Sequence, residues 1–155
     1  MFNSRTYGKV SFDTLVNIIG KYINAEPEYK YKITVGTDSQ SFNNLTKVVV
    51  VIAVTRIGKG GIFFYKIKNV AKITNLKQKI FYEVGRSLEI ADRLNIILAE
   101  KEMFEDVEIH IDVGKNGPTS SIISDVTGWV TSCGYYCKIK PYSSTAFCIA
   151  DRISK

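Results

Sequence analysis

The most constraining feature of the sequence is an unbroken apolar run over residues 48–54, in which every residue but Ala53 is β-branched. A strand with one face in water alternates apolar and polar residues, so this run predicts a strand buried within a sheet. Residues 31–38 alternate before it, and a second apolar stretch, residues 62–67, follows a glycine-rich turn. These three segments predict an antiparallel meander.

The apolar periodicity changes from two residues to 3.6 at about residue 74, which marks the start of a helix. Residues 74–101 carry an apolar stripe from Ile80 to Leu98 and predict a long helix packed on the sheet. Shorter patterns predict five further elements. They are helices over 11–24, 118–132 and 143–155, and strands over 107–112 and 135–140.

This order of elements predicts an α/β fold with a five-stranded mixed sheet flanked by helices. The first and fourth strands are expected to be parallel neighbours. Trp129 lies on an apolar helical stripe and is assigned to the core. The sequence lacks repeats and linkers, so we expect a single domain over residues 1–155, with residues 1–30 as an N-terminal helical extension.

Composition and charge narrow the class of protein. The first ten residues lack a signal-peptide pattern and the longest apolar run is too short to cross a bilayer, so we expect a cytoplasmic protein without a membrane partner. The three cysteines lack CxxC spacing and are expected to be reduced thiols. A formal charge of +6 favours a polyanionic partner such as nucleic acid, although solubility accounts for such an excess as well.

Two aspartates close predicted strands. Asp38 ends the first strand in Gly36-Thr37-Asp38-Ser39, and Asp112 ends the fourth. Ligands of open α/β sheets gather beyond the carboxyl ends of the strands, and parallel pairing of these two strands would place the carboxylates side by side. Either aspartate alone would be an ordinary turn residue, so the joint arrangement makes them candidates for chemistry.

The phase of the long helix separates its acidic residues. With 100° per residue counted from Ile80, Glu83 lies at roughly 60°, on the border of the apolar stripe, whereas Asp92 lies at about 120° and Glu89 at about 180°. Only Glu83 is expected to face the edge of the sheet. Glu89 has Arg86 and Arg93 nearby in sequence and is interpreted as a solvated charge.

The element order and the placement of these acidic residues resemble the ribonuclease H-like fold. More narrowly, short motifs in the C-terminal third are similar to the bacterial YkuK-type ribonuclease H-like family, and the resemblance covers residues 30–155. The motifs are His110-Ile111-Asp112-Val113-Gly114-Lys115-Asn116-Gly117, Gly128-Trp129-Val130, Gly134-Tyr135, Ile139-Lys140-Pro141 and Ala150-Asp151-Arg152.

The resemblance implies a metal-dependent nuclease site whose ligands and catalytic residues are Asp38, Glu83, Asp112 and Asp151. Two Mg²⁺ or Mn²⁺ ions bound by such a quartet supply an activated water and a counter-charge for phosphodiester hydrolysis. Asp38 and Asp112 are expected to bridge or directly bind the ions, Glu83 to bind the second ion and Asp151 the first. Without a cation, the four carboxylates would raise one another's pKa.

Four residues near the quartet are possible accessory groups. His110 faces the same side of its strand as Asp112, so it either lies near the metals and carries protons or is a buried, hydrogen-bonded strand histidine. Lys115 and Asn116 hold a phosphate or belong to a solvated turn. Ser39 directly follows Asp38.

Basic and aromatic residues are possible nucleic-acid contacts, because such side chains bind phosphates and stack on bases without reading sequence. The candidates are Lys59, Lys77, Lys79, Lys138, Lys140 and Tyr142. The leading hypothesis is a nuclease acting on RNA, an RNA–DNA hybrid or structured DNA. Two alternatives stay open: a non-catalytic nucleic-acid-binding module, and an interaction domain that docks an acidic protein.

Overall fold

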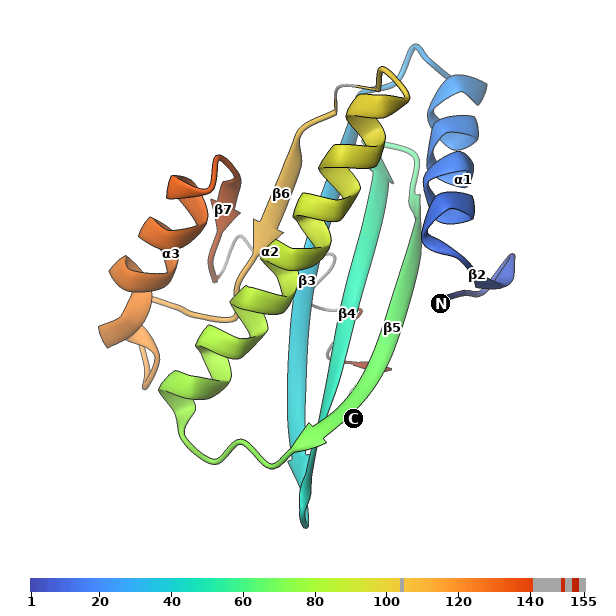
Figure 1. Ribbon diagram of the computed structural model, residues 1–155. Coiled ribbons are helices and arrows are strands. Elements are labelled where there is room, and N and C mark those ends of the chain that lie inside the picture. Colours follow the sequence, from blue (N-terminus) through green and yellow to red (C-terminus); the bar gives the residue numbers. More distant parts are fainter. Residues whose placement is uncertain (104, 141–148, 150–151, 154–155) are drawn as a thin grey trace.

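The structure is a computed structural model that describes residues 1–103, 105–140, 149 and 152–153. A mixed sheet lies behind a long diagonal helix, with a further helix toward either side of the sheet (Figure 1). The strands are β1 (Phe2–Ser4), β2 (Gly8–Val10), β3 (Tyr31–Phe42), β4 (Leu45–Arg56), β5 (Gly61–Ala71), β6 (Val107–His110) and β7 (Tyr136–Lys138). The helices are α1 (Phe12–Ala25), α2 (Leu76–Glu100), the 3-10 turn η1 (Ser120–Ile122) and α3 (Ile123–Ser132).

The sheet has seven strands in the order β2-β1-β5-β4-β3-β6-β7, so the prediction of five strands is wrong. All five expected strands are present. The additional β1 and β2 pair with each other from Phe2↔Val10 to Ser4↔Gly8, and β1 joins β5 at Asn3↔Tyr65. Three-residue strands are too short to show an alternating pattern, which is why the sequence did not indicate them.

The meander prediction is confirmed, and β4 is the most buried strand. It pairs antiparallel with β3 along all twelve residues and with β5 along eleven. Val50, Ile52 and Val54 belong to the main core beneath the helices, whereas Val49 and Val51 belong to a second apolar cluster on the other face. The unbroken apolar run therefore reflects a strand covered on both faces.

The C-terminal residues cover the second face of the sheet. Ile149 and Ile153 pack against the cluster around Val49 and Val51, and the Lys47 ammonium donates a hydrogen bond to the carbonyl of Ile153. Residues 149, 152 and 153 are helical, and the rest of the helix expected over 143–155 lies outside the described residues. In the described part of the chain, no helix has the length and apolar character needed to cross a membrane.

Trp129 is not a core residue, contrary to the assignment from its helical stripe. Val126 and Val130 form the buried side of α3, and Trp129 lies at the margin, 36% exposed, where α3 meets α2. Its ring stacks on Phe81, with 5.8 Å between ring centroids. The indole also packs beside Gly85, where an added Cβ would lie 3.4 Å from the ring.

β3 and β6 are parallel neighbours, as expected, but they differ in length. The pairing runs from Ile33↔Val107 to Gly36↔His110, where β6 ends, while β3 continues to Phe42. Asp38 is therefore within a long strand rather than at its end, and Asp112 is two residues beyond β6. Among the described strands, β3 pairs only with β4 from residue 37 onward, so its other edge is not covered by β6 there, as Figure 1 shows.

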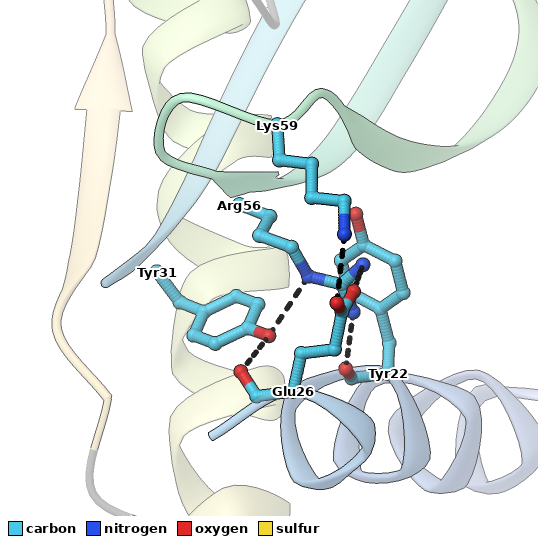
Figure 2. Close-up of polar contacts among 5 residues, drawn as sticks. All are labelled: Tyr22, Glu26, Tyr31, Arg56 and Lys59. Atoms are coloured by element: carbon cyan, nitrogen blue, oxygen red, sulfur yellow. Dashed lines mark hydrogen bonds and ion pairs between the residues drawn. The ribbon is translucent and has the colours of Figure 1, made fainter. Parts of the chain in front are cut away.

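A cluster around Arg56 ties the end of α1 to the sheet (Figure 2). Arg56 forms an ion pair with Glu26 at 2.5 Å, donates hydrogen bonds to the Tyr31 hydroxyl and the Tyr22 carbonyl, and lies over the Tyr22 ring. Lys59 binds the other oxygen of Glu26 at 2.8 Å. One guanidinium thus joins α1, the start of β3 and the end of β4.

We expect Arg56→Met to lower Tm by roughly 5–10 °C, because it removes one partner from a buried network and detaches α1 from the strand ends. Lys59→Met is the matched control. Lys59 is half-exposed and its ion pair is screened, so its loss should lower Tm by no more than about 2 °C. Thermal unfolding followed by circular dichroism measures both, and equal shifts would contradict the anchoring role of Arg56.

Candidate functional site

Asp38 is a buried carboxylate on the strand edge that β6 leaves uncovered. It is 2% exposed and pairs with Val49, which places it on the sheet face opposite α2. Its neighbours Thr37 and Ser39 point to the α2 face, where Thr37 is hydrogen-bonded to Ser87 at 2.7 Å. The parallel register of β3 and β6 ends at Gly36↔His110, two residues before Asp38 on one chain path and two before Asp112 on the other.

Glu83 reaches the same region from α2. The side chain is buried, and its Oε2 accepts a hydrogen bond of 2.6 Å from the Ser39 hydroxyl. Burial is the main reason that the pKa of Glu83 is raised to about 8, against the lowering effects of Ser39 and the Lys79 charge. The negative charges of Asp38 and Asp112 raise it further, so both carboxylates lie near enough to act on Glu83.

Asp112 lies in the loop after β6 and pairs with a lysine. Its Oδ1 is 2.5 Å from the Lys140 ammonium, and the aspartate side chain is 21% exposed. No hydrogen bond to this buried oxygen is found among the described residues, so the contact is an ion pair rather than a directed hydrogen bond. Lys140 reaches it because the backbone is fixed nearby: its N–H donates to the Val113 carbonyl at 2.8 Å.

The structure places Asp38 and Asp112 close enough to Glu83 for their charges to raise its pKa, while Asp151, the fourth member of the predicted quartet, lies outside the described residues. Among the described residues no three His, Cys, Asp or Glu side chains form a group that could hold a metal ion. The donor chemistry still fits Mg²⁺ or Mn²⁺, because carboxylate oxygens are the ligands these ions prefer. Asp112 Oδ1 in particular already holds a cationic partner.

His110 is a buried histidine with a carboxylate partner. Its Nε2 lies 3.1 Å from Glu108 Oε1, and Lys32 lies 3.7 Å from the other oxygen of Glu108. Burial is the main cause that lowers the pKa of His110, and the charges of Lys32 and Lys138 act in the same direction, while Glu108 opposes them. His110 is therefore held neutral at neutral pH.

The remaining loop candidates are solvated. Lys115 and Asn116 are exposed in the segment between β6 and η1, where Gly117 has a φ of 98° that favours glycine. The Gly114 N–H donates to the Thr119 hydroxyl at 3.3 Å and orders this turn. Neither Lys115 nor Asn116 is brought to the carboxylates by a described contact.

The residues predicted to contact nucleic acid differ in the partners that they have within the chain. Lys59 binds Glu26 and Lys140 binds Asp112, so both are engaged within the chain. Lys77 lies over the Phe81 ring at 5.8 Å, at the start of α2. Lys79 is close enough to Glu83 to lower its pKa, and Tyr142 lies outside the described residues.

Sequence reasoning missed two contacts that shape the site. The first is the buried hydrogen bond between Thr37 and Ser87, for which the alternation of β3 and the phase of α2 gave a usable signal. The second is the ion pair of Lys140 with Asp112, which depends on where β7 ends relative to β6. No local pattern in the sequence carries that information.

Comparison with known proteins places the chain in a family. Residues 14–155 match the sequence model described as ribonuclease H-like. The chain therefore belongs to the ribonuclease H-like family. Along its full length it is 31% identical to the uncharacterized protein YkuK of Bacillus subtilis (strain 168), of which the match covers 97%. The resemblance to YkuK-type proteins that the motifs indicated is thus confirmed.

One solved structure is also similar. The crystal structure of RNase H1 from the halophilic archaeon Halobacterium salinarum NRC-1 aligns with 72% of this chain and 86% of its own, at 17% identity and a TM-score of 0.38.

The raised pKa of Glu83 predicts a pH-dependent stability in buffers free of divalent cations. The folded-state pKa is about 8 and the ordinary value is 4.5, so the folded protein binds more protons than the unfolded chain between these values. The contribution of Glu83 to stability is fully present below pH 4.5 and is lost as the pH rises through 8. The slope is at most about 1.4 kcal/mol per pH unit.

Urea unfolding between about pH 5 and 9 tests this, with Glu83→Gln as the variant. The amide of the variant retains an oxygen that accepts from Ser39 but does not titrate, so the advantage of wild type over the variant should shrink as the pH rises. Glu89→Gln is the control, because Glu89 is exposed on the same helix and pairs with Arg86. A difference between wild type and Glu83→Gln that is constant with pH would contradict the assignment.

Proposed function

We propose that the protein is a divalent-metal-dependent nuclease that hydrolyses phosphodiester bonds in RNA, RNA–DNA hybrids or structured DNA. The observation that carries this proposal is the placement of Asp38 and Asp112 near enough to the buried Glu83 for their negative charges to raise its pKa, at the edge of β3 that β6 leaves uncovered. The three carboxylates come from β3, the loop after β6 and α2. Membership of the ribonuclease H-like family supports the same activity.

In this proposal Asp38 and Asp112 hold the cations directly, because each follows the last paired residues of β3 and β6, Gly36 and His110, by two positions. Glu83 completes the site from α2 and is oriented by the Ser39 hydroxyl. Asp151 is retained as the fourth ligand on the basis of the family resemblance. When bound, Mg²⁺ or Mn²⁺ supplies an activated water and a counter-charge for the phosphate.

The chain's own side chains have further roles. Glu83, with a pKa of about 8, exchanges a proton near neutral pH and changes the charge of the site by one unit as it does so. Lys77 and Lys79 stand at the start of α2, on the helix that also carries Glu83, and are assigned to the phosphate backbone of a bound nucleic acid. Such contacts give salt-sensitive affinity with little sequence preference.

A second candidate function is a nucleic-acid-binding module without catalysis. It is favoured by one observation: the described carboxylates do not by themselves form a group that could hold a metal ion, and Lys140 already neutralises Asp112. The net charge of +6 suits either function. The two candidates differ in whether the site needs a divalent ion.

Asp112→Asn tests the nuclease function. The amide cannot replace the carboxylate as an anionic metal ligand, so Mg²⁺-dependent cleavage of labelled RNA, hybrid and branched DNA substrates should fall at least about 100-fold, the equivalent of roughly 3 kcal/mol of transition-state stabilisation. Glu89→Gln is the matched control, a charge loss on an exposed face of α2. Its rate should stay within about twofold of wild type.

The same assay separates the alternatives. Cleavage that survives Asp112→Asn would contradict the assigned site. Salt-sensitive oligonucleotide binding by wild type, without cleavage in Mg²⁺ or Mn²⁺ of any of the three substrate types, would instead establish the binding module.

A further inference from the structure

We propose that Lys140 is an internal counter-ion whose ammonium group occupies the cation position at Asp112 and competes with a divalent metal for that carboxylate. This inference rests on the proposed metal-dependent function and concerns how the site selects its occupant. In the proposed competition, the carboxylate is held either by Lys140 or by the metal, and the balance between the two sets the metal affinity.

The first support is the position of the ammonium group. Lys140 Nζ lies 2.5 Å from Asp112 Oδ1, the oxygen for which the described part of the chain offers no hydrogen bond. The proposed function requires a cation at this same oxygen. The Lys140 side chain is 54% exposed, so solvent is available to receive the ammonium group when it leaves.

The second support is that the backbone holds Lys140 in place for this contact. Beyond the paired residues of β6 and β7, the Ile111 N–H donates to the Lys138 carbonyl at 2.9 Å and the Lys140 N–H donates to Val113 at 2.8 Å. These two bonds bracket Asp112 and keep residue 140 beside it. The pairing therefore fixes the position of residue 140 without help from the ion pair.

The third support is the course of the lysine stem beside the loop after β6. A Cβ at Gly114 would lie 3.4 Å from Cβ of Lys140 and 3.8 Å from its Cδ, which are ordinary contact distances. The aliphatic part of Lys140 therefore runs alongside Gly114, two residues after Asp112. The loop that carries the carboxylate also borders the path of its counter-ion.

The fourth support is that the negative charge of Asp112 needs a counter-charge. Asp112 acts on Glu83 from a partly buried position, so an uncompensated charge there is costly. One ammonium group relieves that cost, and a divalent ion would relieve it more fully. Competition between the two follows because both are attracted by the same oxygen.

The test measures Mn²⁺ affinity by titration, with free Mn²⁺ followed by electron paramagnetic resonance, for wild type and Lys140→Gln. Removing the competitor should tighten Mn²⁺ binding about two- to fivefold, the range expected for loss of a solvent-exposed ion pair. Lys140→Arg keeps the charge and should bind Mn²⁺ as wild type does. Asp112→Asn should bind Mn²⁺ more weakly than wild type by a larger factor.

Lys138→Gln is the matched control, since it removes the same charge two residues earlier and its described contacts include no ion pair with Asp112. It should change Mn²⁺ affinity less than Lys140→Gln does. Thermal unfolding adds a second readout: Lys140→Gln should have a lower Tm than wild type without Mn²⁺ but a larger rise in Tm when Mn²⁺ is added. A purely structural lysine would give the first effect without the second.

Two results would overturn the proposal, and they are distinguishable. If wild type binds Mn²⁺ through Asp112 but Lys140→Gln binds it no more tightly than Lys138→Gln, the counter-ion role fails and the metal site stands. If neither wild type nor Lys140→Gln binds Mn²⁺, the metal-dependent function fails with it. Binding that appears only in Lys140→Gln would support the competition directly.

Discussion

The unequal lengths of β3 and β6 are the constraint on which the site depends. β3 is paired along its whole length by β4, but its parallel neighbour stops at His110, opposite Gly36. Beyond that point β6 no longer covers the edge of β3, and the chain after β6 continues through Asp112 and Gly114. Asp38 on one sheet face and Asp112 in the loop can both act on Glu83, which comes from the helix on the other face, because none of the described strands separates them there.

The central sheet could be predicted because its strands carry long patterns. The apolar run of β4 indicated burial on both faces, and the structure shows two clusters that cover it. The strands β1 and β2 could not be predicted, since three residues hold less than two alternations and the pairing of β1 with β5 is a long-range contact. Trp129 was misplaced because α3 turns its Val126 and Val130 side inward and leaves the indole at a helix–helix margin.

The acidic residues of the candidate site were selected from the sequence for different reasons. Asp38 and Asp112 were chosen as candidates from strand order, because parallel neighbours place corresponding positions side by side, and the parallel pairing of β3 and β6 is confirmed. Glu83 followed from helical phase, and its burial agrees with the border position that the phase gave. What the sequence could not indicate was the state of these groups. The proton affinity of Glu83 and the partner of Asp112 depend on burial and on a lysine that is 28 positions away along the chain.

The protonation of Glu83 and the ion pair of Asp112 change the electrostatic balance of the acidic cluster. Judged from the sequence alone, the carboxylates are all negatively charged, so they repel one another and require a metal. In the folded chain the repulsion is already reduced, because Glu83 tends to hold a proton at neutral pH and Lys140 neutralises Asp112. Each of these compensations contributes one positive charge and each is reversible. A divalent cation that took their place would bring the same two charges, so the exchange would leave the net charge of the site nearly unchanged. A divalent cation would then be favoured over the Glu83 proton and the Lys140 ammonium only by its coordination geometry and by carrying both charges on one ion. Because this advantage is small, the metal affinity is sensitive to the single surface lysine Lys140.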